Sequence, residues 1–174
     1  MTDLRFRAAT VSDVEPIVAL VSAAYRGEAS TVGWTSEDHL LKGQRTDADM
    51  VTAAIADPDG TVQLVERDGR LLGCIQITHA GTAAHFGMFA VDPMLQAGGV
   101  GSALLTHAES LAREQWGCTS MDLEVIGQRE SLIAYYARRG YRATGDTAPF
   151  PYGDERFGIP QRDDLYFAVL RRAL

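Results

Sequence analysis

The stretch "FAVDPMLQAGGVGSALL", residues 89–105, begins like a strand, contains three glycines within four residues and continues as an apolar helix. Gly98, Gly99 and Gly101 leave several backbone N–H groups uncovered at a helix N-terminus. Such a terminus carries free donors and partial positive charge, so the stretch predicts an anion site. No Gly-Lys-Ser/Thr follows, which excludes the loop that binds nucleoside triphosphates with Mg²⁺. The order Gln-Ala-Gly-Gly-Val-Gly also differs from the dinucleotide fingerprint Gly-x-Gly-x-x-Gly.

The elements on either side of this stretch must hold it in place. Apolar alternation and short apolar runs predict strands over residues 4–9, 84–93, 120–126, 141–145 and 163–174, and a hairpin over 61–80 that turns at Asp68-Gly69. Helical spacing predicts helices over residues 10–27, from near Ser36, over 47–60, from the glycines to Gly117, and over 129–140. Thr10 or Ser12 is the expected first cap, and Leu104, Leu105, Ala108, Leu111 and Ala112 form one apolar stripe. Strands before and after helices indicate an α/β fold with a mixed sheet.

Length and charge limit the class of protein. A chain of 174 residues that is 46% hydrophobic fits one domain over residues 1–174. Its 16 Lys+Arg against 23 Asp+Glu give a net charge of −7 without a basic run, so binding to nucleic acid or an anionic membrane is not expected. The charged start "MTDLRFRAATVSDVEP" does not read as a signal peptide, and no apolar run could span a bilayer, so we expect a cytoplasmic protein.

Cysteine and histidine spacing gives no sign of a metal centre. Cys74 and Cys118 lack zinc or redox spacing, and we expect them to be buried free thiols. The four histidines have no metal-binding spacing such as His-Glu-x-x-His. His85, near the start of the strand before the glycines, is either a structural residue or a base.

The glycine stretch resembles one known signature. Gln96, Gly99 and Gly101 fill Gln/Arg-x-x-Gly-x-Gly/Ala after a strand that ends Val-Asp-Pro, and the order of elements matches over nearly the whole chain. The sequence is therefore similar to the GNAT superfamily of acyl-CoA-dependent N-acyltransferases. This resemblance implies a mixed, mostly antiparallel central sheet flanked by helices, with acetyl-CoA as co-substrate and no metal. It implies that the coenzyme is held by Gln96, by the pyrophosphate-binding amides of Ala97, Gly98, Gly99, Val100, Gly101 and Ser102, and by the pantetheine-binding strand backbone at Phe89, Ala90 and Val91.

Two further residues suit the chemistry of a thioester. An amine that attacks a thioester must lose a proton, and the departing thiolate benefits from gaining one. Glu124 lies on a predicted strand and Tyr136 on the next helix, so the two can converge at the open end of the sheet. The segment resembles the ribosomal-protein N-terminal acetyltransferase branch of GNATs, which implies Glu124 as the base and Tyr136 as the acid. The alternatives are a solvated Glu124, a core Tyr136, and Tyr135 as the acid.

Arginines near the predicted helix over 129–140 leave two interpretations open. Where the family usually has an asparagine that binds pantetheine, this chain has Arg129, which either reaches a coenzyme A phosphate or stays in solvent. Arg138 and Arg139 either meet the phosphates of the nucleotide or only complement the helix dipole.

The acceptor is expected between two loop regions, residues 25–34 and 148–164, which commonly wall the acceptor pocket in GNATs. Candidate acceptor-binding residues are Tyr25, Glu28, Trp34, Phe150, Tyr152 and Phe157, with Glu28 or Asp154 attracting a cationic amine; each aromatic residue alternatively packs its loop onto the domain. The favoured function is direct acetyl transfer to the primary amine of a small molecule. The alternatives are a peptide or protein N-terminal acetyltransferase and an acyl-CoA-binding sensor with little catalysis. Dimers are common in the superfamily, so a homodimer is one expected state.

Overall fold

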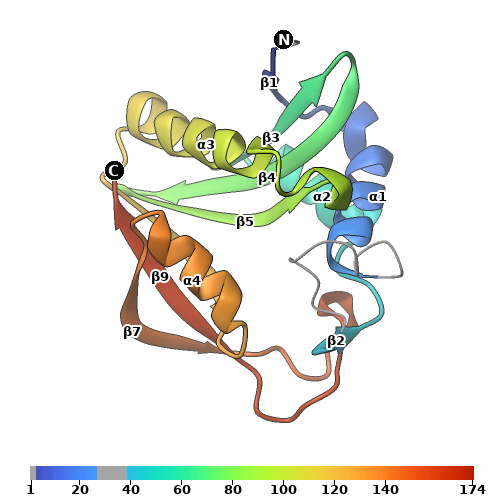
Figure 1. The fold of residues 1–174 in the computed structure, drawn as a ribbon, viewed down its shortest axis with the longest axis vertical. Coiled ribbons are helices and arrows are strands. Elements are labelled where there is room, and N and C mark those ends of the chain that lie inside the picture. Colours follow the sequence, from blue (N-terminus) through green and yellow to red (C-terminus); the bar gives the residue numbers. More distant parts are fainter. Residues whose placement is uncertain (1–2, 27–38) are drawn as a thin grey trace.

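A seven-stranded sheet organises the computed structural model, which describes residues 3–26 and 39–174. The strand order is β1-β3-β4-β5-β6-β9-β7, and a two-stranded sheet pairs β2 with β8 (Figure 1). The strands are β1 (Arg5–Ala8), β2 (Leu41–Lys42), β3 (Gly60–Arg67), β4 (Arg70–Ala80), β5 (Ala83–Val91), β6 (Ser120–Ile126), β7 (Arg142–Pro149), β8 (Ile159–Pro160) and β9 (Tyr166–Ala173). The α-helices are α1 (Val14–Tyr25), α2 (Ala48–Ala56), α3 (Val100–Trp116) and α4 (Glu130–Arg138).

The sheet is mixed and mostly antiparallel, as predicted. Only β5 and β6 run parallel, and they pair over just three residues of each strand, from Ala83 with Ser120 to His85 with Asp122. Beyond that point the two strands separate, while β6 continues beside β9 as far as Ile126. The separation leaves β5 beyond His85 without a strand partner on the side of β6.

A β-bulge lies in β5 where the two strands have parted. Cys74 of β4 is opposite Ala90, but Gln76 is opposite Gly87, so Met88 and Phe89 together face a single residue of β4. Met88 has a φ of 47°, a left-handed conformation that is rare for a residue other than glycine. Such backbone strain costs about 1–3 kcal/mol and is found mainly at functional sites.

Helices cover both faces of the sheet, because residues along each strand alternate between faces. Val65, Ile75 and Ile77 pack in one apolar cluster with α3 and with Tyr136 of α4, whereas Leu64 and Cys74 pack in another with α1 and α2. The five residues of the predicted α3 stripe are all buried. Figure 1 shows α3 lying along β3 and β4, and α4 beside β9.

Local signals in the sequence account for most element boundaries. Asp68 and Gly69 both have positive φ in the predicted hairpin turn, and Asp47 caps α2 by accepting from the Met50 N–H at 2.8 Å. Thr10 precedes a 3₁₀ turn, Val11–Asp13, that leads into α1. Gly117 ends α3 with a φ of 66°.

Some elements differ from the prediction. The strand expected over residues 141–145 is observed as β7, Arg142–Pro149, because after an irregularity between Ala143 and Thr147 it pairs with β9 again as far as Pro149. The short strands β2 and β8 were not predicted, since two-residue strands leave no periodicity to read. The helix expected from near Ser36 begins outside the described residues.

The two cysteines are buried free thiols, as predicted. Burial raises the pKa of Cys74 to about 12, and its Sγ donates to the Met88 carbonyl at 3.5 Å. A thiol that remains protonated is a poor nucleophile, so Cys74 has a structural role. Among the described residues, no group of three or more His, Cys, Asp or Glu could hold a metal ion, and no helix is long and apolar enough to cross a membrane.

Candidate active site

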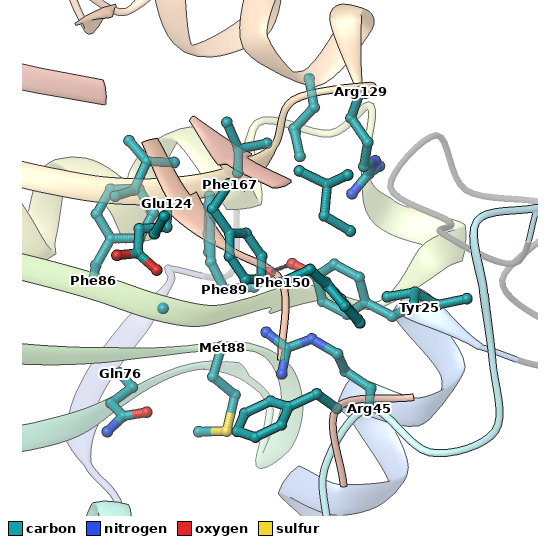
Figure 2. Close-up of a pocket in the computed structure, with 18 of the residues that line it drawn as sticks. Tyr25, Arg45, Gln76, Phe86, Met88, Phe89, Glu124, Arg129, Phe150 and Phe167 are labelled. Atoms are coloured by element: carbon teal, nitrogen blue, oxygen red, sulfur yellow. Dashed lines mark hydrogen bonds between the residues drawn. The ribbon is translucent and has the colours of Figure 1, made fainter. Parts of the chain in front are cut away.

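Two cavities open beside the separated part of β5. The larger, of about 500 Å³, is lined by residues of β5 and β6 and by residues 148–151; Figure 2 shows residues that line it. The smaller, of about 220 Å³, lies between the N-terminus of α3 and one face of α4. Both are lined by Tyr25, Phe89, Leu132 and Tyr136. Two molecules, one in each cavity, can therefore meet beside these four residues.

The smaller cavity contains most of the predicted anion loop. Its lining includes Phe89, Val91, Gln96, Ala97, Gly99, Gly101 and Ser102. Gly99 precedes α3 with a φ of 79°, and its carbonyl accepts a hydrogen bond from the Ala103 N–H. The N–H groups of residues 100–102 therefore lack partners within the helix. These donors and the positive end of the helix dipole make the cavity suitable for an anion.

Three of the predicted coenzyme-binding residues, Ala90, Gly98 and Val100, do not line the smaller cavity. Ala90 and Val100 are each only 2% exposed and belong to the core, so only their backbone is available to a ligand. Gly98 does not line the smaller cavity, and its N–H donates to the Leu95 carbonyl at 3.0 Å. Contact of these residues with coenzyme A stays a prediction.

Tyr136 stands where the cavities meet. It is 4% exposed, and its ring packs against those of Phe86, Tyr135 and Tyr141 at centroid distances of 5.8, 5.2 and 5.8 Å. Burial raises the pKa of Tyr136 well above its ordinary value; the nearby Tyr25 and Tyr135 phenols add to this rise, and Arg129 opposes it. The phenol is therefore protonated at neutral pH and can donate a proton. Tyr135 lines only the smaller cavity, with its hydroxyl 3.9 Å from where a Cβ on Gly101 would stand.

Tyr25 reaches the same meeting point from the end of α1. Its hydroxyl donates to the carbonyl of Phe89, the second residue of the bulge in β5. The guanidinium of Arg45 lies over its ring, with Cζ 5.2 Å from the centroid. Tyr25 therefore contacts both the separated strand and a cation in the larger cavity.

Glu124 and His85 are acid–base groups in the wall of the larger cavity. Figure 2 shows the Glu124 carboxylate pointing into it. Removal from bulk water lowers the pKa of His85, while the nearby carboxylates of Glu124 and Asp122 act to raise it. A neutral imidazole beside a carboxylate can accept a proton. The predicted convergence of Glu124 and Tyr136 on one cavity is observed.

The predicted acceptor-binding residues divide into three groups. Tyr25, Phe150 and Phe157 line the larger cavity. Tyr152 lines neither cavity: its hydroxyl donates to the Arg162 carbonyl and accepts from the Leu165 N–H, both at 2.9 Å, so it packs its loop onto the domain. Glu28 and Trp34 lie outside the described residues.

Asp154, considered as an attractor of a cationic amine, has another partner. Its carboxylate accepts from the Arg156 guanidinium at 2.6 Å, and it lines neither cavity. The expectation that it faces the acceptor is therefore not met, because a neighbouring arginine already compensates its charge.

Three arginines line the cavities. Arg129 is 5% exposed, which excludes a solvated role, and it lines the larger cavity rather than the smaller. Arg139 lines the smaller cavity, stacks over Tyr135 with its Cζ 4.9 Å from the ring centroid, and keeps a buried Nε without a hydrogen-bond partner. Arg45 lines the larger cavity, and the sequence analysis missed it, since it lies in a polar loop without a motif.

The family model described as "Acetyltransferase (GNAT) family" matches residues 21–141, which include both strands of the site and the anion loop. The chain belongs to the GNAT family. A relative among characterised proteins is the S-alkylcysteine N-acetyltransferase of Bacillus subtilis (strain 168), which is 30% identical over 151 residues, covering 81% of this chain and 80% of that protein. This GNAT protein is accordingly an acetyltransferase enzyme of a family that uses acyl-CoA.

Solved structures share the GNAT fold over the full length. Ard1 from Thermoplasma volcanium matches with a TM-score of 0.72 at 20% identity, covering 98% of this chain and 97% of that one. The ribosomal-protein-S18-alanine N-acetyltransferase from Escherichia coli matches at 0.68 and 16%, covering 98% and 94%. PaiA N-acetyltransferase from Thermoplasma acidophilum, solved with coenzyme A, matches at 0.66 and 14%, covering 99% of both chains. At these identities the likeness establishes the fold.

Proposed function

We propose that this GNAT protein transfers an acetyl group from acetyl-CoA to the primary amine of a small molecule by direct attack. The observation that carries the proposal is the pair of cavities that meet at Tyr136. One cavity has the free N–H donors of a helix terminus, and the other has acid–base side chains. A thioester entering from the first would present its carbonyl to an amine held in the second.

The smaller cavity suits the coenzyme. The N–H groups at the start of α3 would bind the pyrophosphate, and the guanidinium of Arg139 adds a cation beside them. The edge of β5 at Phe89 and Val91 has no strand partner on the side of β6 and would bind the amide groups of pantetheine, beside the Tyr25 hydroxyl and the Gln96 amide that already bond to these two carbonyls. Acetyl-CoA is thus the co-substrate that fits the donors present.

The reaction needs two proton transfers, one from the attacking amine and one to the departing sulfur, and different side chains would carry them out. The Glu124 carboxylate, with His85 beside it, would accept the proton that the attacking amine loses. The nitrogen forms a bond to the thioester carbon, the C–S bond breaks, and the Tyr136 hydroxyl gives its proton to the departing sulfur. Tyr136 suits this role better than Tyr135, because only Tyr136 lines both cavities.

The larger cavity favours a small acceptor over a peptide. Its volume of about 500 Å³ is in the range of small-molecule pockets, and Phe150 and Phe157 cover it from the loop before β9. The similarity to an S-alkylcysteine N-acetyltransferase supports the same choice. A protein N-terminus is the second candidate, and an acyl-CoA sensor with little catalysis is the third.

The test combines binding with turnover. Isothermal titration with acetyl-CoA and coenzyme A is followed by a thiol-release screen against S-alkylcysteines, other amino acids, polyamines, aminoglycosides and peptides. Thiol release that depends on a small amine supports the proposal. Release only with peptides moves the assignment to a protein N-terminal acetyltransferase, and acetyl-CoA binding without release from any amine indicates the sensor.

A further inference from the structure

Arg45 is a charged residue of the larger cavity that the transfer chemistry does not use. It lies in the segment between β2 and α2, and Figure 2 shows its guanidinium pointing into the cavity toward Met88 and Phe150. The side chain is half-buried. A guanidinium is protonated at every working pH, so the cavity holds a fixed positive charge at this wall.

No carboxylate of the described residues forms an ion pair with Arg45, and its guanidinium lies over the ring of Tyr25. Several other described arginines do form ion pairs with a carboxylate, at 2.6–3.2 Å: Arg7, Arg70, Arg113, Arg156, Arg162, Arg171 and Arg172. Glu124, which lines the same cavity, is not within ion-pair distance of Arg45. The protein carries a net charge of −7, yet it leaves this cation uncompensated where a substrate would enter.

The surroundings of Arg45 define which anion would fit. A guanidinium presents two parallel N–H donors that match the two oxygens of a carboxylate. A phosphate would call for more donors close by, but Arg129, the other arginine that lines this cavity, lies away from Arg45 just before α4 (Figure 2). The lining contributed by Tyr25, Met50 and Met88 is mainly apolar. Such walls keep water away and strengthen a single charged pair. One arginine in this setting is suited to one carboxylate.

We propose that the acceptor is an amino acid with an apolar side chain, and that Arg45 binds its carboxylate. This inference rests on the proposed acetyl transfer and specifies its substrate class. The amine of the acceptor lies toward Glu124 and Tyr136, the carboxylate toward Arg45, and the apolar part against Phe150 and Phe157. The reaction is unchanged: a C–N bond forms, the thioester C–S bond breaks, coenzyme A leaves as the thiol, and the carboxylate remains intact.

The test compares matched acceptors that keep or lack the carboxylate, with kcat/KM expressed per neutral amine because the amine pKa also differs among them. Each of several apolar L-amino acids is assayed with its carboxamide and its decarboxylated amine, and kcat/KM is measured by thiol release. We expect the acid to exceed both partners that lack the carboxylate by about 10-fold or more, since a hydrogen bond to a charged group contributes about 1.5–3 kcal/mol. Equal values for acid, amide and amine would overturn the inference while leaving acetyl transfer established.

Variants connect the preference to Arg45. Arg45→Met should lower the ratio of acid to amine to about one, and Arg45→Lys should retain part of it, because lysine keeps the charge without the paired donors. Arg113→Met is the matched control, since Arg113 is exposed on α3 and lines neither cavity, and it should keep the wild-type ratio. An unchanged ratio in Arg45→Met would contradict the assignment.

A binding measurement keeps the inference testable without turnover. The N-acetyl amino acids, which are the expected products, are titrated into the protein saturated with coenzyme A, with the N-acetyl amides as controls. Tighter binding of the acids to the wild type, lost in Arg45→Met, supports the carboxylate site. If neither acids nor products interact in either assay, the inference is wrong; if acetyl-CoA also fails to bind, the proposed function fails with it.

Discussion

Replacing Tyr136 with phenylalanine should impair turnover far more than it affects folding or coenzyme binding. The ring of Tyr136 fills a buried space among Phe86, Tyr135 and Tyr141, and these contacts remain when only the hydroxyl oxygen is removed. No described residue forms a hydrogen bond with that hydroxyl, so the substitution leaves no buried donor or acceptor unpaired. The free energy of unfolding should change by less than about 1 kcal/mol.

The loss of rate follows from the role of a general acid. A positioned proton donor contributes about 10²- to 10⁴-fold, which corresponds to about 2.7–5.4 kcal/mol in the activation barrier. Because burial raises the pKa of Tyr136 well above its ordinary value, the phenol remains protonated across the neutral and mildly alkaline range. Tyr136→Phe should therefore lower kcat at every pH from 6 to 9 (roughly the working range of an enzyme assay), whereas the dissociation constant for acetyl-CoA stays within about threefold.

The assay is thiol release under saturating acetyl-CoA, with acetyl-CoA affinity measured by titration and folding by thermal unfolding. Tyr135→Phe is the control, because Tyr135 lines only the smaller cavity. Wild-type turnover in Tyr136→Phe together with a large loss in Tyr135→Phe would refute the reasoning and assign the acid to Tyr135. A loss below about tenfold in Tyr136→Phe would show that water supplies the proton.

Two further predictions address the anion loop and the core. A Cβ on Gly101 would meet Val91 at 3.5 Å and Phe89 at 3.6 Å, which are ordinary contacts, so Gly101→Glu and Gly101→Gln should both fold. The carboxylate of the Glu variant suits a helix N-terminus, but it would repel the pyrophosphate by about 3 kcal/mol at about 5 Å and an effective dielectric constant near 20. Titration should therefore show coenzyme A affinity at least tenfold weaker for the Glu variant than for the Gln variant. Equal affinities would contradict the anion site. The pKa of Cys74 is raised to about 12, so the unfolded chain loses this proton first as pH rises, and stability falls by about 1.4 kcal/mol per pH unit above the ordinary thiol pKa of about 8.5. The free energy of unfolding, measured with urea between about pH 9 and pH 11, should therefore fall less steeply with pH in Cys74→Ala than in the wild type, by that amount. Parallel plots of this free energy against pH for the two proteins would show that Cys74 does not titrate on unfolding.

Local features of the site could be predicted from the sequence. The cap and turn preferences of glycine determine how β5 passes into α3, so Gly99 and the free donors after it could be predicted from a short stretch. Helical spacing likewise separates Tyr136 from Tyr135 by about 100°, and in the structure both residues line the smaller cavity while Tyr136 alone of the two also lines the larger.

Features that depend on packing between distant segments could not be predicted. The bulge at Met88 reflects how β4 and β5 pair, and Gly87 beside it is a weak signal on its own. Arg45 acquires its importance from the cavity it lines and could not be predicted from its polar loop, whereas Arg139 was already a candidate for contact with phosphates. Tyr152 illustrates the opposite case, since an aromatic residue in a polar loop suggested a ligand contact but packs the loop instead.

The most direct test of the two-cavity arrangement is an experimental structure of the protein with coenzyme A. The arrangement predicts the pyrophosphate at the N–H groups of residues 100–102, pantetheine along β5, and the sulfur within hydrogen-bonding reach of the Tyr136 hydroxyl, at roughly 3–3.5 Å. A sulfur in the larger cavity away from Tyr136, or a pyrophosphate bound elsewhere than at the start of α3, would contradict it.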